Sequence, residues 1–387
     1  MRLQILLITQ SRPFPAITGG RQRTHFIYEA LSTLGDVDIF LQDIGAKISH
    51  QAKSQIELEY RVVEWVRPVN TSPQLTLDDG TTQCDADEEC RSALLRCLAK
   101  RRYDLVVGRY IASVVRAGSF DHPVLIIDVD DVPSFLSDSR SRSPNPGHID
   151  ASLESRVARV LTSCAALWVS KLNDRRFNGL ERSIVLPNIP YYRTPSYCEP
   201  RQCRTIVFVG ALKNRSNVEG LTSFIRTAWP LILLQCPDAH LRIVGYGLDE
   251  WAKREWSGVS NVELIGYVED VNRVYRDSSF SIVPVSTERG THVKVAESCA
   301  CGRTCVTTAL AHKGYEETLP AGVACMVASN MEEFASHCVT LLCNHKLNCS
   351  LSFTAWRIAN TRFTFQSFRD IVDTTVRSVL SRDKLYI

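Results

Sequence analysis

A ten-residue segment, Glu288–Glu297 (ERGTHVKVAE), combines residue types that recognise a phosphorylated nucleotide. It follows an apolar run at 280–285 and opens a stretch with helical spacing. Gly290 and the first N–H groups of that helix would therefore meet an anion. Lys294 and Glu297 are three residues apart and share one helix face. A lysine neutralises a diphosphate and a glutamate accepts from ribose hydroxyls, although the same spacing also fits a surface Lys–Glu pair.

Two glycine pairs follow expected strands. Gly19 and Gly20 stand before the first expected helix, where backbone N–H groups could approach a phosphate or a sugar. A plain turn has the same composition. Gly245 and Gly247 follow a later strand, but no third glycine completes G-x-G-x-x-G, so a nicotinamide cofactor is not indicated.

Three acids, Asp128, Asp130 and Asp131, come directly after an expected strand at 124–127. Carboxylates this close could bind a divalent cation. They could equally cap a helix and stabilise the turn at Pro133. A third interpretation is that one of the acids lines a ligand-binding cleft.

The elements that must position these residues alternate between strand and helix. Short apolar runs typical of buried parallel strands recur with helical patterns between them. Strands are expected at 3–8, 37–41, 61–66, 105–107, 124–127 and 167–170, and again at 206–209, 241–244, 262–265, 280–285 and 305–308. The fold class is therefore α/β, with two doubly wound halves separated by a proline-rich stretch at 184–204.

Ligands of such sheets bind at the carboxyl ends of the strands, so both halves can offer loops to one cleft. Arg109 follows the strand at 105–107 and either points toward that edge or is a surface arginine.

Composition excludes several classes. The 387 residues include 45 Lys and Arg against 42 Asp and Glu, too even a balance to indicate nucleic acid or an anionic membrane as main partner. No apolar run approaches the roughly 20 residues of a membrane span, and no signal peptide is expected. The 14 cysteines contain no Cys-x-x-Cys. We expect them to be buried small apolar residues rather than zinc ligands or disulfides.

Four stretches of the second half resemble the donor-binding domain of family 4 glycosyltransferases of the GT-B fold. They are FVGAL with NVEG in 208–220, PDAHLRIVGYG at 237–247, VELIGYVED at 262–270, and IVP with RGTHVKVAE in 282–297. The first half is similar to the acceptor domain in the Gly19–Gly20 loop, DVDD at 128–131 and LPN at 186–188. The resemblance covers nearly the whole chain.

The resemblance implies retaining transfer of a sugar from a nucleotide-diphosphate donor to a glycan, lipid-linked or other glycoconjugate acceptor. In the family, the glutamate matching Glu297 binds the nucleotide ribose. The lysine matching Lys294 and the Gly19–Gly20 loop contact the diphosphate and stabilise the negative charge of the leaving group. Fixed donors of this kind stabilise a leaving group without a metal, so no metal and no cofactor are expected, and the nucleotide sugar is a co-substrate.

The site implied by the resemblance has three groups of residues. We expect Asp130, Lys294 and Glu297 to be catalytic. The donor-binding set is Gly19, Gly20, Gly210, Lys213, Arg215, Gly245, Arg289, Gly290, Thr291, Lys294 and Glu297. The acceptor side is Arg109, Asp128 and Asp131.

The sequence departs from the family pattern at three points. Arg289 stands where many members carry a second glutamate, eight residues before the one matching Glu297. Ala211 replaces the arginine that usually follows the glycine of the first donor-domain strand, and Lys213 or Arg215 could substitute for it.

The third departure lies in the first half. Many members carry a histidine after the strand matching 124–127, where this chain has acids, and Asp130 or Asp131 could take that sugar-facing role.

The sequence thus predicts a GT-B fold with Rossmann-like domains at 1–190 and 191–365 and a C-terminal helix, 366–387, that packs back on the first domain. It predicts a cytoplasmic glycosyltransferase in polysaccharide or glycoconjugate assembly. Peripheral membrane contact is left open and no nucleic-acid partner is expected. Two alternatives remain: an epimerase of the same fold using His292 or Asp128 as acid or base, and a nucleotide-sugar-binding protein with weak or no transferase activity.

Overall fold

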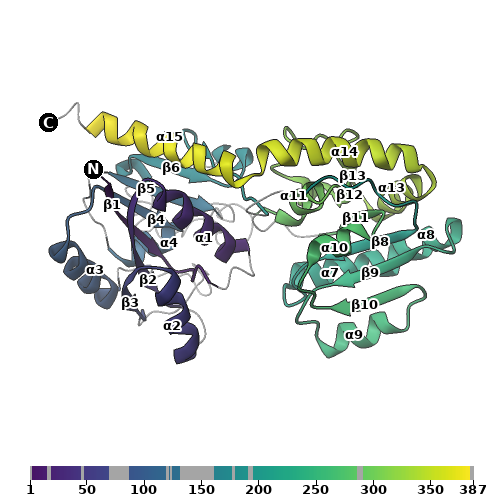
Figure 1. Cartoon of the computed structure of the whole chain (residues 1–387). Helices are drawn as coiled ribbons and strands as arrows, with labels where there is room; N and C mark the ends of the chain where they lie inside the picture. Colours follow the sequence, from purple (N-terminus) through teal and green to yellow (C-terminus); the bar gives the residue numbers. More distant parts are fainter. Residues whose placement is uncertain are drawn as a thin grey trace, which may run out of the picture. The chain divides into compact units, whose positions relative to one another are not determined.

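The computed structural model describes most of the chain, in two compact units (Figure 1). The described residues are 2–14, 19–44, 48–68, 87–118, 122, 124–130, 161–176, 179–190, 195–285 and 291–383. One unit is Met1–Pro187 with Phe368–Ile387, and the other is Asn188–Ser367. The expected divisions were after 190 and 365.

The first unit contains a parallel seven-stranded sheet in the order β3-β2-β1-β4-β5-β6-β7. Its strands are β1 (Leu3–Thr9), β2 (Gly35–Gln42), β3 (Val62–Val66), β4 (Leu105–Arg109), β5 (Leu125–Asp130), β6 (Ala166–Val169) and β7 (Ile184–Val185). The order reverses between β1 and β4, which both pair through apolar runs buried on both faces. The carboxyl ends of these two strands are therefore where a doubly wound sheet binds its ligand.

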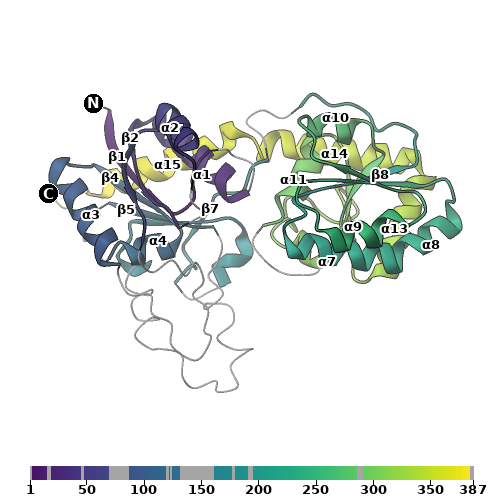
Figure 2. The ribbon, with the colours of Figure 1, turned by 90° about the horizontal axis from the view of Figure 1, so that it is seen from below.

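Helices cover both faces of this sheet. They are α1 (Gly19–Ser32), α2 (His50–Glu59), α3 (Glu88–Lys100), α4 (Ile111–Arg116), the 3-10 helix Leu172–Arg176 and α15 (Phe365–Asp383). Figure 2 shows α1 and α15 on one face and α3 and α4 on the other. Asp87 begins α3 by accepting from the Cys90 N–H at 3.0 Å, as an N-cap side chain does.

Helix α15 packs on the first unit, which confirms the expected return of the C-terminal helix. The rings of Phe368 and Phe26 on α1 lie with centroids 6.3 Å apart, and both are buried. The indole N–H of Trp168 on β6 donates to Thr375 on α15 at 3.2 Å.

The second unit contains a parallel six-stranded sheet in the order β10-β9-β8-β11-β12-β13. Its strands are β8 (Thr205–Val209), β9 (His240–Val244), β10 (Val262–Gly266), β11 (Phe280–Val283), β12 (Cys305–Thr308) and β13 (Met326–Ala328). Here the order reverses between β8 and β11. The two doubly wound sheets confirm the predicted fold class.

Alternate residues of β8 meet different helices. Ile206 and Phe208 join the core with α7 and α8, whereas Val207 and Val209 pack with Tyr275 of α10. The helices of this unit are α7 (Arg215–Ser223), α8 (Trp229–Gln235), α9 (Glu250–Ser257), α10 (Val271–Arg276), α11 (Val293–Ala300), α12 (Ala309–His312), α13 (Met331–Cys343) and α14 (His345–Arg362). Figure 2 shows α7, α8 and α13 on one face and α10 and α14 on the other.

A π-helical stretch, Phe224–Ala228, joins α7 to α8. Its last hydrogen bond runs from the Trp229 N–H to the Phe224 carbonyl, five residues back. The next residue, Pro230, has no N–H and cannot continue the regular pattern, which gives the widened turn a local cause.

None of the helices in the described part of the chain is both long and apolar enough to cross a membrane.

Candidate functional site

The loops after β8 and β9 are bound to each other beside the point where the strand order of the second unit reverses. The Gly210 N–H donates to the Val244 carbonyl at 3.0 Å, and the Leu212 N–H donates to the Tyr246 carbonyl at 2.9 Å. A Cβ on Gly245 would lie 1.8 Å from the Gly210 carbonyl oxygen. The two loops can approach this closely only because glycine stands at 245.

Lys294 lies in the first turn of α11 and reaches the loop after β8. Its ammonium donates to Asn217 Oδ1 and lies 4.8 Å from the centre of the Phe208 ring. The Nζ atom would be 3.2 Å from a Cβ on Gly210, so the missing side chain there leaves room beside the ammonium. Asn217 is itself fixed by donating to the Ala211 carbonyl at 2.7 Å.

The charge of Lys294 is weakly compensated. Burial lowers the pKa of Lys294 to about 8, and the nearby Glu297 carboxylate opposes that shift. An anionic ligand would supply the missing compensation and raise the pKa again.

Glu297 follows Lys294 by one turn of α11. The Tyr275 hydroxyl, on α10, donates to Glu297 Oε2 at 3.0 Å. Tyr275 is buried and Glu297 is half-buried, so the carboxylate is oriented while part of it stays accessible. This arrangement suits a carboxylate that accepts hydrogen bonds from a ligand.

The two proposed substitutes for the missing arginine have different surroundings. The Arg215 side chain is 90% exposed and pairs with Glu219 at 2.6 Å on the outside of α7, so the structure does not bring Arg215 to this site. The stem of Lys213 lies against Gly247, and its ammonium is 5.9 Å from the Tyr246 ring centre. Lys213 is exposed at the edge of the paired loops.

The predicted phosphate-binding segment is described only from Thr291 onward. Glu288, Arg289 and Gly290 lie outside the described residues. Thr291 is half-buried, and its carbonyl accepts from the Val293 N–H at 2.9 Å just before α11.

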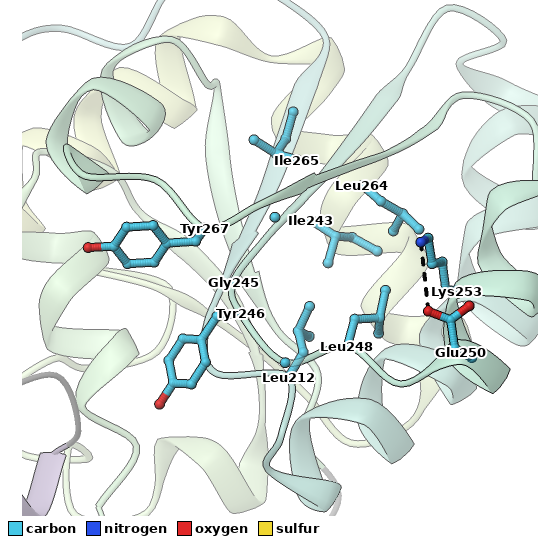
Figure 3. Close-up of a pocket in the computed structure, with 12 residues that line it drawn as sticks. Leu212, Ile243, Gly245, Tyr246, Leu248, Glu250, Lys253, Leu264, Ile265 and Tyr267 are labelled. Carbon is cyan, nitrogen blue, oxygen red and sulfur yellow. Dashed lines mark ion pairs between the residues drawn. The ribbon is translucent and has the colours of Figure 1, made fainter. Parts of the chain in front are cut away.

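A pocket of about 390 Å³ adjoins the paired loops (Figure 3). Apolar side chains line one part of it, among them Leu212, Leu248 and Leu264. Tyr246 and Tyr267 lie along another part. An apolar pocket with aromatic rings at its rim is suited to a flat heterocyclic group.

Two arginines and two aspartates form a buried network at the carboxyl ends of β4 and β5 in the first unit. Asp128 accepts from Arg23 Nη2 at 2.6 Å and from Arg109 Nη1 at 2.5 Å. Arg109 Nη2 donates to Asp130 at 2.8 Å, and Arg23 Nε is 3.5 Å from the same carboxylate. Each aspartate thus has both arginines beside it.

Arg109 remains charged within this network. Burial disfavours the charged guanidinium, but the Tyr110 hydroxyl and the Asp130 and Asp128 carboxylates outweigh that effect and raise the pKa of Arg109. Its remaining donors reach Thr24 and the Gly20 carbonyl at 2.7 and 3.0 Å.

These positions correct part of the acceptor-side expectation. Arg109 and Asp128 are both 0% exposed, so neither is presented to an acceptor, and the two arginines occupy the carboxylate that the metal interpretation of Asp128 would need. Asp131 lies outside the described residues. Asp130 differs, because its side chain is 14% exposed.

Asp130 also has an unusual backbone. Its φ of 46° lies in the left-handed region, and its carbonyl accepts from Ser170 at 2.8 Å. Tyr110, beside Arg109, has φ of 67°. Such conformations cost about 1–3 kcal/mol each and gather at functional sites.

The glycine pair expected in a loop instead begins α1. Gly19 is exposed and Gly20 half-buried, so N–H groups of the helix N-terminus lie there. A Cβ on Gly20 would be 2.8 Å from the Tyr110 hydroxyl, which ties this helix start to the Arg109 network.

Sequence reasoning missed four residues that hold the two sites. Arg23 and Tyr110 belong to the network of the first unit, and Asn217 and Tyr275 orient Lys294 and Glu297. For Arg23 a signal existed, because it follows Gly20 by three residues and so lies on the same helix face.

Comparison with known proteins agrees with the resemblance. Residues 203–344 match the family described as Glycosyl transferases group 1. No curated protein sequence matches the chain.

Solved structures share the fold across the whole chain. Sucrose-phosphate synthase from Thermosynechococcus elongatus superposes with a TM-score of 0.72 at 15% identity, covering 98% of this chain and 100% of that one. HepE of Anabaena, solved with UDP and glucose, gives 0.66 at 14% identity, covering 97% and 100%. A glycosyltransferase from Rickettsia africae gives 0.67 at 12% identity, covering 98% and 99%. These superpositions confirm the predicted GT-B fold, and residues 203–344 are similar to the group 1 glycosyl transferases.

Proposed function

We propose that this chain, whose residues 203–344 match the group 1 glycosyl transferases, is a retaining glycosyltransferase with a nucleotide-diphosphate sugar as donor. The observation that carries the proposal is the Lys294 ammonium. It is half-buried at the strand-order reversal of the second unit, beside the space that Gly210 leaves open, and burial lowers its pKa. A ligand bearing negative charge gains most from such a cation.

The donor diphosphate is assigned to Lys294 and the N-terminus of α11. The ammonium and the positive end of the helix dipole both stabilise negative charge, which increases on the diphosphate as the sugar leaves. This arrangement supports transfer without a dedicated metal at the donor site.

The nucleoside is assigned to Glu297 and the adjoining pocket. Glu297 lies one turn beyond Lys294 and is oriented by Tyr275, which fits a carboxylate that accepts from two ribose hydroxyls. The pocket with Tyr246 and Tyr267 at its rim fits the base. UDP is the first nucleotide to test, because the Anabaena structures contain it.

Asp130 is assigned to the transferred sugar or the acceptor. Among the acids that the structure describes in DVDD at 128–131, only Asp130 has an exposed part, and Arg109 and Arg23 orient its carboxylate. A glycan or lipid-linked acceptor, and peripheral contact with a membrane, remain predictions from the resemblance.

The alternatives receive less support. An epimerase using Asp128 would need an accessible acid or base, whereas Asp128 is buried between Arg23 and Arg109. A nucleotide-sugar-binding protein would have the same donor site, and only product formation separates it from a transferase.

Thermal unfolding with UDP, GDP, ADP and CDP tests the donor site. A ligand at about 100 times its Kd adds roughly 2.7 kcal/mol to stability. We expect one nucleotide to raise Tm, Glu297→Ala to abolish the shift, and Glu219→Gln, an exposed acid on α7, to retain it. Equal shifts in wild type and Glu297→Ala would contradict the assigned site.

Product analysis then tests the reaction. With the sugar nucleotide of the responding base, we expect slow donor hydrolysis and, with an acceptor, a product whose anomeric configuration by NMR matches that of the donor. An epimerised nucleotide sugar would support the epimerase, and binding without either product would support the binding protein.

A further inference from the structure

Three metal-ligating side chains meet in the second unit, on the α14 side of its fold. His345 is the first residue of α14 and Cys349 follows four residues later, so both lie on one helix face. The Cys349 sulfur is 3.4 Å from His345 Nε2 and 3.8 Å from Nδ1. An oxygen of Glu199, in the segment 195–200, completes a set whose ligand atoms all lie within 4.8 Å of one another.

Aromatic packing fixes the segment that carries Glu199. The Tyr197 ring lies 5.2 Å from the Phe353 ring and 5.4 Å from the Trp356 ring, both on α14. The Trp356 indole N–H donates to the Pro195 carbonyl at 2.9 Å. The backbone that carries the exposed Glu199 is therefore held against α14 before any ion binds.

The sulfur–nitrogen separation matches a tetrahedral ion. With Zn–S of about 2.3 Å and Zn–N of about 2.0–2.1 Å, tetrahedral angles place sulfur and nitrogen about 3.5 Å apart. The distance between Cys349 Sγ and His345 Nε2 is 3.4 Å. Thiolate, imidazole and carboxylate are the three ligand types that zinc takes in proteins.

We propose that Glu199, His345 and Cys349 bind a zinc ion through one oxygen, one nitrogen and one sulfur, leaving the fourth position to water. The ion would link the segment 195–200, near the start of the second unit, to the first turns of α14. The site lies outside the residues assigned to the nucleotide and does not depend on the proposed reaction.

The charges around the site favour a soft divalent ion. Glu199 and a Cys349 thiolate supply two negative charges. The Arg303 guanidinium lies nearby, donating to the Cys198 carbonyl at 2.7 Å. Its positive charge repels a cation, but it also favours the Cys349 thiolate that the ion needs. The N-terminus of α14 opposes the ion as well. Zinc gains more from thiolate than Mg²⁺ or Ca²⁺ does, so the hard ions are excluded.

Binding exchanges a proton for the metal. The Cys349 S–H bond breaks, the Zn–S bond forms, the proton leaves to solvent, and no electron is transferred. Zinc competes with protons for the thiolate and the imidazole, so its affinity increases with pH.

Cobalt provides the direct test, because thiolate-bound Co²⁺ absorbs in the near ultraviolet and d–d bands report tetrahedral geometry. Metal-free full-length protein is titrated with Co²⁺ and then with Zn²⁺. We expect one equivalent of Co²⁺ to give both signals and Zn²⁺ to displace it. Cys349→Ser should remove the thiolate band, and His345→Gln and Glu199→Gln should each weaken zinc binding at least tenfold.

A second thiol pair provides the matched control. Cys236 and Cys343 lie with sulfur atoms 3.7 Å apart, elsewhere in the same unit. Cys343→Ser should bind Co²⁺ like the wild type. If Cys343→Ser loses the thiolate band and Cys349→Ser keeps it, the metal binds at the other pair and the proposal is wrong. The proposal is equally wrong if the wild-type protein gives no thiolate band with Co²⁺. Tm of each metal-free variant, compared with that of the wild type, checks that the variants are folded.

Discussion

The surroundings of Lys294 determine its chemistry. Its ammonium contacts one amide oxygen and one aromatic face, and burial brings its pKa down to about 8. A surface lysine would be fully charged at neutral pH and compensated by water. The partly buried Lys294 ammonium is instead stabilised by a bound anion, and it loses its proton at mildly alkaline pH when the site is empty.

We therefore predict a pH dependence for nucleotide binding. The free site loses the Lys294 proton as pH rises through about 8, whereas a bound diphosphate retains it. Affinity should be constant below that pKa and about tenfold weaker at pH 9 than at pH 7. Calorimetry at several pH values measures this.

Lys294→Met should weaken nucleotide binding about 10- to 100-fold, because a charge-assisted hydrogen bond is lost. Its remaining affinity should show no step near pH 8. Arg215→Met is the control, since the exposed Arg215 side chain pairs with Glu219 and is not brought to this site. A similar loss in both variants would argue against a specific role for Lys294.

Substitutions of Asp128 and of Asp130 should have different effects, the first mainly on stability and the second mainly on activity. Asp128→Ala removes the fully buried one of the two carboxylates that Arg23 and Arg109 share, and removing one partner of a buried ion pair costs about 3–5 kcal/mol. Asp130→Asn keeps the size of a partly exposed side chain and should reduce product formation with a much smaller loss of stability. Chemical denaturation and turnover, measured on both variants, check this; an active Asp130→Asn would remove Asp130 from the mechanism.

At the scale of elements, close approach of two loops organises the nucleotide side of the site. The loops after β8 and β9 touch through Gly210 and Gly245, and a Cβ at 245 would lie 1.8 Å from a carbonyl oxygen. Gly245→Ala should cost about 1–3 kcal/mol and weaken nucleotide binding, because the loops must separate.

Gly258 provides the comparison for that substitution. It ends α9, and a Cβ there would meet nothing within 4 Å. Gly258→Ala should leave both unfolding and nucleotide binding nearly unchanged. Equal effects at 245 and 258 would show that the loop contact is unimportant.

The elements with apolar faces were predictable from the sequence. β1, β8 and β11 are runs of apolar residues buried on both faces, and periodicity alone located them. Helix α14 was missed, because its buried face includes Asn348 and Ser352, which bond Ser279 and the Thr304 N–H instead of filling an apolar core.

The candidate site was predictable only in part, for a similar reason. Lys294 and Glu297 share a helix face that spacing reveals. The partners that orient them, Asn217 and Tyr275, come from 77 and 22 residues away and are brought there by strand order. Arg109 and Asp128 lie at the carboxyl ends of parallel strands, where such sheets bind their ligands. That position alone does not predict which of these side chains a neighbouring helix covers.

At the scale of the whole molecule, the last helix belongs to the first unit. Phe368 on α15 is fully buried against Phe26, so Phe368→Ala should cost that unit about 3–5 kcal/mol. Hydrogen exchange should show that α1 and β6 lose protection, whereas the protection of β8 to β12 stays unchanged. Arg377→Ala, on the exposed side of the same helix, should change neither the stability nor the protection of the first unit. A loss of protection throughout the chain in Phe368→Ala would contradict the division into two units.

This arrangement has a consequence for biosynthesis. The chain leaves the first unit at residue 187 and re-enters it only at 368. During translation, at about 5–20 residues per second, the first sheet must wait roughly 10–40 s for the helix that covers Phe26 and Trp168. The second unit is contiguous and can fold while the first is still incomplete. Chaperones that act on nascent chains should therefore bind the N-terminal half, and synonymous codons that slow translation of the second half should lengthen that exposure.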